Sequence, residues 1–245
     1  MKFVLQILLF LLLPLFLCGA EIEKWSVPVE TDLYLQKQGF SLGYSHKYRQ
    51  AIWVAYILTA DNLKAKQVAR SNAFKPDLEV KYRPVYPQEY TKTGFDKGHL
   101  APAADMTYSV PSMESSFLMT NISPQIPGCN RGIWKRLESK VRRWALKEEK
   151  LFVVTGPIFS DKFSVMGKSS IPIPMAFYKV ILDLTPPMKM IGFIVPNETS
   201  KRHVESFVVP VDNVEIVTGC NFFSELDDEL EKRLEAASDY TAWEK

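Results

Sequence analysis

The sequence predicts a single α+β domain with a central, mainly antiparallel sheet and helices on its faces. Three observations lead to this fold class: short β-branched or alternating apolar segments recur along the chain, a longer segment after residue 130 has helical periodicity, and the two kinds do not alternate strictly. Strict alternation would instead favour a doubly wound parallel sheet. A length of 245 residues with 47% apolar residues is enough for one sizeable core.

The N-terminal residues have the order of a secretory signal peptide. Lys2 gives a positive start, an apolar run follows to Leu17, and small residues end at Ala20, before a charged stretch. We therefore expect cleavage after Ala20, an exported (periplasmic or secreted) protein, and one domain over residues 21–245, with no stable membrane insertion. The alternatives are an uncleaved anchor, for which the run is short against roughly 20 residues, and lipid attachment at Cys18.

The elements follow from local patterns, taken in chain order. We expect a β-hairpin over 40–58 with its turn at 45–50, extended loop over 80–90 around the prolines at 84 and 87, and a short helix over 113–119. A second proline-containing loop over 121–128 precedes a long helix that starts at 130. Four further strands follow at 151–155, ending at Gly156-Pro157, and at 176–184, 190–195 and 206–210, and a C-terminal surface helix covers 225–237.

One of the three histidines lies in a polar, glycine-containing segment. The segment reads Phe95-Asp96-Lys97-Gly98-His99, and an imidazole with an ordinary pKa of about 6.5 suits a general base near neutrality. On this segment alone, a structural histidine is the alternative. His46 and His203 lie in hydrophilic stretches, so we expect both at the surface.

A second segment begins with an asparagine and continues with helical periodicity. Asn130, Trp134 and Glu138 are spaced four residues apart, which predicts one helix face spanning about 12 Å. An amide oxygen is a hard ligand suited to Mg²⁺. The alternatives are a helix N-cap for Asn130 and an ordinary helix carboxylate for Glu138. Trp134 and Trp144 are expected in the core.

The same helix is strongly basic although the whole chain carries a formal net charge of only +2. Such a stretch favours contact with phosphates, and a solvated helix face is the alternative. The basic residues are Arg131, Lys135, Arg136, Lys140, Arg142, Arg143 and Lys147.

Taken together, the two segments resemble the DNA/RNA non-specific endonuclease family, which includes endonuclease G and secreted bacterial nucleases of the ββα-metal fold. The family is marked by an Asp-Arg-Gly-His box, an Asn-x-x-Pro-Gln stretch and an Asn-x-x-x-Trp-x-x-Leu-Glu stretch. The matching positions here are Asp96 to His99, Asn121 to Gln125, and Asn130 to Glu138. Blocks at 154–159, 173–180 and 193–197 are also similar to later family blocks, so the resemblance covers most of the mature chain.

The resemblance implies a role for each matching residue. His99 would be the general base, Asn130 the only direct protein ligand of one Mg²⁺ or Mn²⁺ ion, and Glu138 would orient the waters of that ion. Asn121 and Gln125 would belong to the loop that supports the site, with Gln125 close to the substrate.

Basic residues complete the set that the resemblance implies. Arg70 would stabilise charge on the phosphate, with Arg83 as a rival for this role, and Arg131 and Lys135 would contact the substrate. DNA and RNA are the expected partners, cut to leave 5′-phosphates, and a protein inhibitor is a further candidate partner.

One position departs from the family pattern: Lys97 stands where the box has arginine. Lysine keeps the charge but loses the bidentate geometry that matches phosphate oxygens, so we expect reduced turnover or altered preference. This departure leaves open a nucleic-acid-binding homologue with weakened catalysis. A narrower phosphodiesterase is the other alternative.

Two cysteines, Cys129 and Cys220, remain after signal cleavage. An exported protein can hold them as a disulfide, but two separate, partly buried thiols are the favoured expectation.

Overall fold

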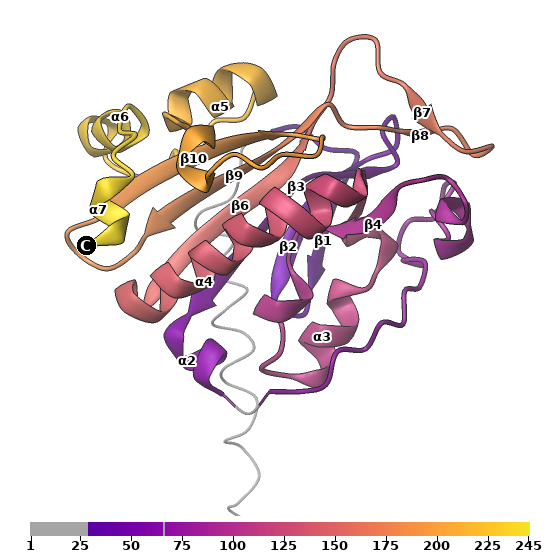
Figure 1. Ribbon diagram of the computed structural model, residues 1–245, viewed down its shortest axis with the longest axis horizontal. Helices are drawn as coiled ribbons and strands as arrows, with labels where there is room; N and C mark the ends of the chain where they lie inside the picture. Colours follow the sequence, from indigo (N-terminus) through magenta and orange to yellow (C-terminus); the bar gives the residue numbers. More distant parts are fainter. Residues whose placement is uncertain (1–28, 66) are drawn as a thin grey trace, which may run out of the picture.

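A seven-stranded sheet is the centre of the computed structural model, which describes residues 29–65 and 67–245 (Figure 1). All neighbouring strands are antiparallel, in the order β1-β2-β3-β6-β9-β10-β11. The predicted antiparallel sheet is thereby confirmed. The strands are β1 (Leu33–Lys37), β2 (Phe40–Ser45), β3 (Gln50–Thr59), β6 (Lys150–Ile158), β9 (Ala176–Asp183), β10 (Lys189–Pro196) and β11 (Val208–Val209).

Helices cover both faces of this sheet. Alternate side chains of a strand point to opposite faces, and in the central strands both sets are apolar. Val153 and Ile181 share a core with the long helix α4 (Lys135–Glu148). The neighbouring Val154 and Val180 instead pack on the side of α5 (Val211–Thr218) and α6 (Asp228–Glu235). The sheet therefore separates an α4 face from an α5/α6 face.

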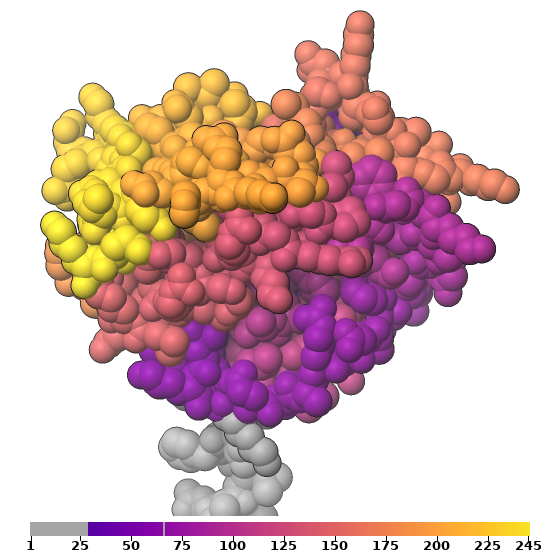
Figure 2. Space-filling view, in the orientation of Figure 1, coloured from indigo at the N-terminus to yellow at the C-terminus, as the bar shows by residue number. Residues whose placement is uncertain are grey.

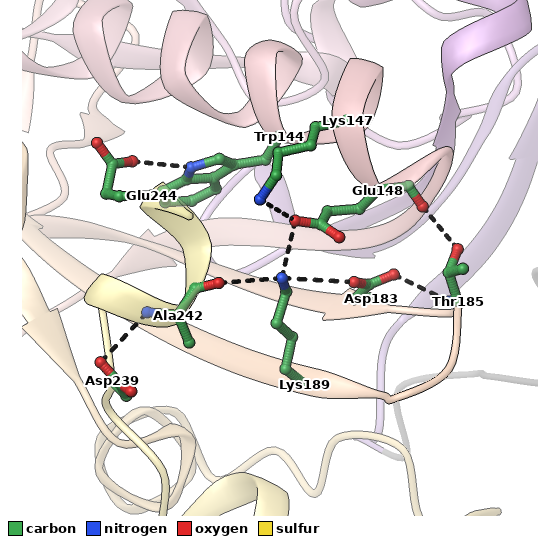
Figure 3. A network of polar contacts seen from close by, with 9 residues as sticks. All are labelled: Trp144, Lys147, Glu148, Asp183, Thr185, Lys189, Asp239, Ala242 and Glu244. Atoms are coloured by element: carbon green, nitrogen blue, oxygen red, sulfur yellow. Dashed lines mark hydrogen bonds and ion pairs between the residues drawn. The ribbon is translucent and has the colours of Figure 1, made fainter.

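The C-terminal helix α7 (Thr241–Glu244) closes the α4 face (Figure 3). Trp243 is 1% exposed and its ring lies 5.0 Å from that of Trp144 in α4. Beside this contact the Lys189 ammonium on β10 donates to Glu148 at 2.8 Å and to the Ala242 carbonyl at 3.2 Å. The last residues of the chain are thus fixed to α4 and β10 together.

A separate two-stranded sheet precedes α4. It consists of β4 (Asp96–His99) and β5 (Ile122–Gln125), which pair antiparallel with His99 opposite Ile122. The turns η2 (Ala103–Asp105) and η3 (Met119–Asn121) and helix α3 (Val110–Ser116) connect the two strands. The chain then enters α4 through a distorted turn, η4 (Cys129–Trp134). The order strand, strand, helix places the residues of both sequence motifs beside one another.

The remaining elements are short. They are α2 (Ala60–Lys64), η1 (Pro87–Tyr90), η5 (Val204–Phe207) and the small hairpin of β7 (Val165–Met166) and β8 (Ile171–Pro172), which projects from the body in Figure 1.

Three predictions for proline-containing segments were wrong. The loop expected at 80–90 ends in the short helix η1, whose first residue is Pro87. The loop expected at 121–128 contains β5, where Pro124 is tolerated because a two-stranded sheet leaves one edge of each strand open. The strand expected to end at Gly156-Pro157 continues to Ile158. Pro157 lies beyond Thr155, the last β6 residue shown opposite β3, and pairs only with β9. Its missing N–H therefore removes no bond to β3.

The hairpin over residues 40–58 and the strands near 176–184 and 190–195 are confirmed as β2–β3, β9 and β10. Trp134 and Trp144 are buried as expected. Cys129 and Cys220 are separate buried thiols, in the cores on opposite faces of the sheet. The predicted signal peptide lies outside the described residues. Within them, no helix has the length and apolarity needed to cross a membrane.

Candidate active site

His99 ends β4 on a support of aromatic rings. Its ring centre lies 5.0 Å from that of Phe117 and 5.5 Å from that of Phe74, and the residue is 8% exposed. Burial, together with the positive charge of Arg70, lowers the pKa of His99 to about 3. The imidazole is therefore neutral at physiological pH. Its Nε2 atom is buried without a hydrogen-bond partner among the described residues, an unfavourable state for a ring with only a structural role.

Arg70 and His99 both contact the Phe117 ring. The Arg70 guanidinium lies over the Phe117 ring at 5.1 Å, and its Nε donates to Asn72 Oδ1 at 2.8 Å. Arg83 is elsewhere, where its carbonyl accepts a bond from Arg49. Of the two arginines considered from the sequence, the fold brings Arg70 to the histidine.

Lys97 lies on the same side of β4 as His99, because residues two apart in a strand share a face. Its ammonium is 5.2 Å from the centre of the Phe74 ring and 5.8 Å from that of Tyr90. Phe74 thus contacts both the histidine and the lysine. The cation that replaces the expected arginine is placed beside the candidate base.

Asn130 is held by an aspartate at the other end of β4. Its Nδ2 donates to Asp96 Oδ2 at 2.9 Å, and Arg131 donates to both oxygens of Asp96 at 2.8 and 2.6 Å. Burial alone would raise the pKa of Asp96, but the bonds from Arg131 and Asn130 outweigh burial and lower it. Because the amide nitrogen is engaged, the orientation of the Asn130 oxygen is fixed.

The helix prediction around Asn130 needs a correction. Gly132 has φ −105° and ψ −106°, outside the helical region, and the regular helix begins only at Lys135. Asn130 therefore does not share one straight helix face with Trp134 and Glu138. The kink turns the Asn130 side chain toward β4, while Trp134 enters the core with no exposed surface.

Glu138 faces a group of buried charges behind the site. Burial raises its pKa, and the nearby Lys179 opposes that change most strongly. Lys179 on β9 is completely buried, with its ammonium 4.9 Å from the centre of the Trp134 ring, and burial lowers its pKa. Next to them, Arg142 donates to Asp105 at 2.8 Å, and Asp105 also accepts from Tyr56 at 2.9 Å.

Asn121 and Gln125 are both completely buried. The Asn121 amide bonds both backbone groups of Ala101 at 2.9 Å and the Ser116 carbonyl at 2.9 Å, so it fixes the chain just after His99. The Gln125 side chain packs directly over Gly98, where a Cβ would lie 2.2 Å from its amide carbon. Both side chains therefore hold the segment around His99 in place.

The donor set near Asn130 fits a single hard cation. An amide oxygen is available because Asp96 holds the amide nitrogen, and the half-buried Glu138 carboxyl belongs to the adjoining helix. Among the described residues, the one group of three acidic side chains close enough to share an ion is Asp212, Glu215 and Glu235. That group belongs to α5 and α6, on the opposite face of the sheet from α4.

Sequence reasoning missed several residues of this site. Asp96 was part of a motif but received no role, and Arg142 was only one of many basic residues. Lys179 lies in a strand pattern that otherwise predicts core. A lysine inside an otherwise continuous apolar strand segment is a usable sequence signal, because buried lysines without a charged partner are rare. No sequence pattern indicated that Phe74 and Phe117 support His99.

A strand pair followed by a helix, with a histidine ending one strand and an asparagine just before the helix, defines the ββα-metal class of nucleases. The chain belongs to the DNA/RNA non-specific endonuclease family, whose model matches residues 18–229. It is an endonuclease that hydrolyses phosphodiester bonds, in a family that depends on metal ions.

Individual relatives agree with this assignment. Nuclease C1 of Cunninghamella echinulata var. echinulata is 34% identical over 79% of this chain and 84% of the relative. Endonuclease G, mitochondrial, of Caenorhabditis elegans is 34% identical over 85% of this chain and 73% of the relative. A solved structure of the EndoG/EndoGI complex, described as showing the mechanism of EndoG inhibition, superposes with a TM-score of 0.80 at 27% identity. The match covers 86% of this chain and 94% of that one.

Proposed function

We propose that this protein is an exported nuclease that cuts DNA and RNA without marked sequence preference, with His99 as the general base. One observation carries the proposal: His99 is a buried, neutral imidazole with an unpaired ring nitrogen, and two cationic side chains share its aromatic support. A neutral imidazole accepts a proton, and the cations favour the approach of a phosphate.

The proposed reaction begins with proton transfer to His99 from the water that attacks phosphorus. Because the pKa of His99 is lowered to about 3, the base is available at every pH above about 4. Its strength as a base is low until the negative charge of a phosphate arrives beside it, which favours the protonated ring. Substrate binding and proton transfer thus support one another.

Arg70 and Lys97 would stabilise the charge that develops on the phosphate oxygens. Both are held against aromatic rings, at 5.1 Å from Phe117 and 5.2 Å from Phe74, and Arg70 makes one hydrogen bond to Asn72. Neither forms an ion pair with an acid in the described part of the chain. Their charge therefore remains available to an anion.

A single Mg²⁺ ion, or Mn²⁺, would be held by the Asn130 oxygen near Glu138, where it would act as a Lewis acid toward the phosphate. Asp96, which holds Asn130, and His99 begin and end the same strand, so β4 connects the proposed metal ligand to the base.

Low sequence preference follows from contacts made mainly to phosphates, which carry no base information. Arg131 and Lys135, both exposed just beyond Asn130, are the proposed first contacts. Products with 5′-phosphates are part of the proposal.

Export and inhibition are further parts of the proposal. The signal-peptide pattern of residues 1–20 supports export, and a mitochondrial location, as in the named mitochondrial relatives, is the competing outcome. An inhibited EndoG complex among the similar structures supports a protein inhibitor as a partner. Edman sequencing of the secreted chain, starting at Glu21, checks the first point.

The test is digestion of supercoiled plasmid and total RNA by the protein with Mg²⁺, Mn²⁺ or EDTA, followed by end analysis. We expect degradation of both substrates with either metal, none with EDTA, and ends that a kinase labels only after phosphatase treatment. A folded protein that binds plasmid without cutting it would support the weakened homologue instead. Cleavage of a chromogenic phosphodiester but not of plasmid would support the narrower phosphodiesterase.

A further inference from the structure

A groove of about 810 Å³ runs along the exposed side of α4, next to the candidate active site. On its α4 wall, Arg136, Lys140 and Arg143 are spaced four and three apart and share one helix face, with Lys135 and Ser139 beside them. The opposite wall comes from the segment that carries Lys201 and Arg202, which lies alongside α4 in Figure 2. Two parts of the chain far apart in sequence therefore face each other with positive charge.

The groove holds far more positive than negative charge. Seven of its fourteen lining residues are Lys or Arg, and two are Glu. One of these acids, Glu244, accepts hydrogen bonds from Lys140 at 2.6 Å and from the Trp144 indole at 3.0 Å, the latter drawn in Figure 3. With Lys140 paired to Glu244 and Arg131 paired to Asp96, five Lys or Arg residues and one Glu remain, so the groove attracts anions.

Several of these cations are held in place without an acidic partner. Arg136 donates to the Ser200 and Arg202 carbonyls at 3.2 and 2.9 Å, which joins the two walls. Arg143 and Lys201 are exposed and form no ion pair within the described residues. A merely solvated helix face would be convex and mixed in charge, whereas this face is concave and its charges converge.

The groove leads directly to the proposed metal ligand. Arg131 and Gly132 line its near end, and Arg131 also donates to Asp96, the residue that holds Asn130. From Lys135 to Arg143 the helix extends roughly 12 Å. At about 3.4 Å of duplex axis per nucleotide of one strand, that length faces at least three phosphates beyond the cleaved one.

We propose that this groove binds the phosphate backbone of the nucleic acid several nucleotides away from the cleaved bond, so that affinity depends on substrate length. The inference rests on the proposed function for the identity of the ligand as nucleic acid. It adds Arg136, Arg143, Lys201 and Arg202 to the substrate contacts. Short substrates would reach the catalytic residues without the groove, whereas long substrates would use both.

The test removes Arg143 and Lys201 together, as Arg143→Ala/Lys201→Ala. Its matched control is Lys232→Ala/Arg233→Ala, which removes the same two residue types from exposed positions of α6, on the other face of the sheet. Fluorescence anisotropy in EDTA measures binding of labelled oligothymidylates of about 20 and about four nucleotides. Thermal unfolding verifies that both variants fold.

We expect the groove variant to bind the long oligonucleotide at least about ten-fold more weakly. Its slope of log affinity against log salt should fall by about 1.4, or about 0.7 for each lost phosphate contact on a single strand. Binding of the short oligonucleotide should be unchanged, and the control should match the unmodified protein for both. Equal long-oligonucleotide affinities for the groove and control variants would overturn the proposal.

Cleavage assays separate this proposal from the proposed function. If the unmodified protein cuts plasmid and both double variants bind and cut alike, the groove has no role although the nuclease function holds. If the unmodified protein cuts nothing but the groove variant alone loses long-oligonucleotide binding, the groove proposal holds and the catalytic one fails.

Discussion

Each face of the central sheet holds a glutamate whose pKa is raised by burial, and the surroundings of these two carboxyl groups differ. Glu138, on the α4 face, is influenced by Lys179, Arg142 and Arg70, all positive, as well as by Asp105. Glu235, on the α5/α6 face, is 6% exposed, and burial together with Glu215, Glu231 and Asp212 raises its pKa to about 8. Burial raises the pKa of both groups, but only Glu138 has cations that favour its charged form.

This difference teaches that burial of a carboxyl group does not by itself identify a functional site. A neutral Glu235 among other acids serves as a proton-sharing structural group. Burial raises the pKa of Glu138 to about 7, while Lys179, Arg142 and Arg70 favour its charged form; a charge in such a low-dielectric environment has large effects on a nearby ion or phosphate. The two faces differ in the charges that surround each glutamate, and burial raises the pKa on both.

The largest expected effect comes from removing the buried cation beside Glu138. Lys179→Met should lower the free energy of unfolding by about 2–3 kcal/mol, because it removes the neighbour that most strongly favours the charged form of Glu138. Lys189→Met on the neighbouring strand is the matched control; that lysine is 23% exposed and pairs with Glu148, so about 1 kcal/mol is expected. Urea unfolding measures both, and equal losses would show that Lys179 does not balance Glu138.

Neutralising each glutamate in turn compares the two faces by activity. Glu138→Gln should lower plasmid cleavage about ten- to a hundred-fold, the usual effect of removing a group that supports a metal site. Glu235→Gln should leave cleavage unchanged, because it lies on the far side of the sheet. Initial rates with saturating Mg²⁺ provide the test, and a comparable loss in Glu235→Gln would contradict the division between the faces.

The pH dependence of stability should follow Glu235. Its folded-state pKa is raised, so the folded protein holds this proton more tightly than the unfolded chain does. The resulting stabilisation is complete below the ordinary pKa of about 4.3 and is lost as the pH rises to about 8. Glu235→Gln should therefore unfold at a higher temperature than the unmodified protein at pH 8 and at a similar one at pH 4.

A smaller effect is expected at the C-terminal end of the basic groove. Glu244→Gln removes the negative charge that pairs with Lys140. Because the Glu244 side chain is 41% exposed, the change should lower the free energy of unfolding by less than about 1 kcal/mol. The same change adds one unit of positive charge to the groove. Oligonucleotide binding by anisotropy should tighten slightly, and weaker binding would argue against an electrostatic role for this end.

Much of the fold was predictable because apolar periodicity determines which side chains face a core. The hairpin β2–β3, the strands β9 and β10, and the helix α4 follow from that pattern. The strand β5 was not predictable, because Pro124 within it signals a loop unless the open edge of a two-stranded sheet is known. The kink at Gly132 was equally hidden, since the apolar spacing continues across it.

The candidate site was predictable from motifs only as far as its residue types. His99, Asn130 and Glu138 were identified with their expected roles, but the contacts that hold them depend on distant parts of the chain. Phe74 and Phe117 support His99, and Lys179 faces Glu138 from a strand about forty residues later. The complete burial of Asn121 and Gln125 against the chain around His99 was equally not readable from the motifs.

The most direct test of the central claim is the rate at which His99→Ala cleaves plasmid with Mg²⁺, compared with the unmodified protein at equal folded concentration. Loss of a general base should lower the rate by about a hundred- to ten-thousand-fold, with Mg²⁺-independent oligonucleotide binding retained. Because burial and Arg70 lower the pKa of His99 in the free enzyme, kcat/KM of the unmodified protein should show no acid limb near pH 6.5. A His99→Ala rate within about ten-fold of the unmodified protein would contradict the account.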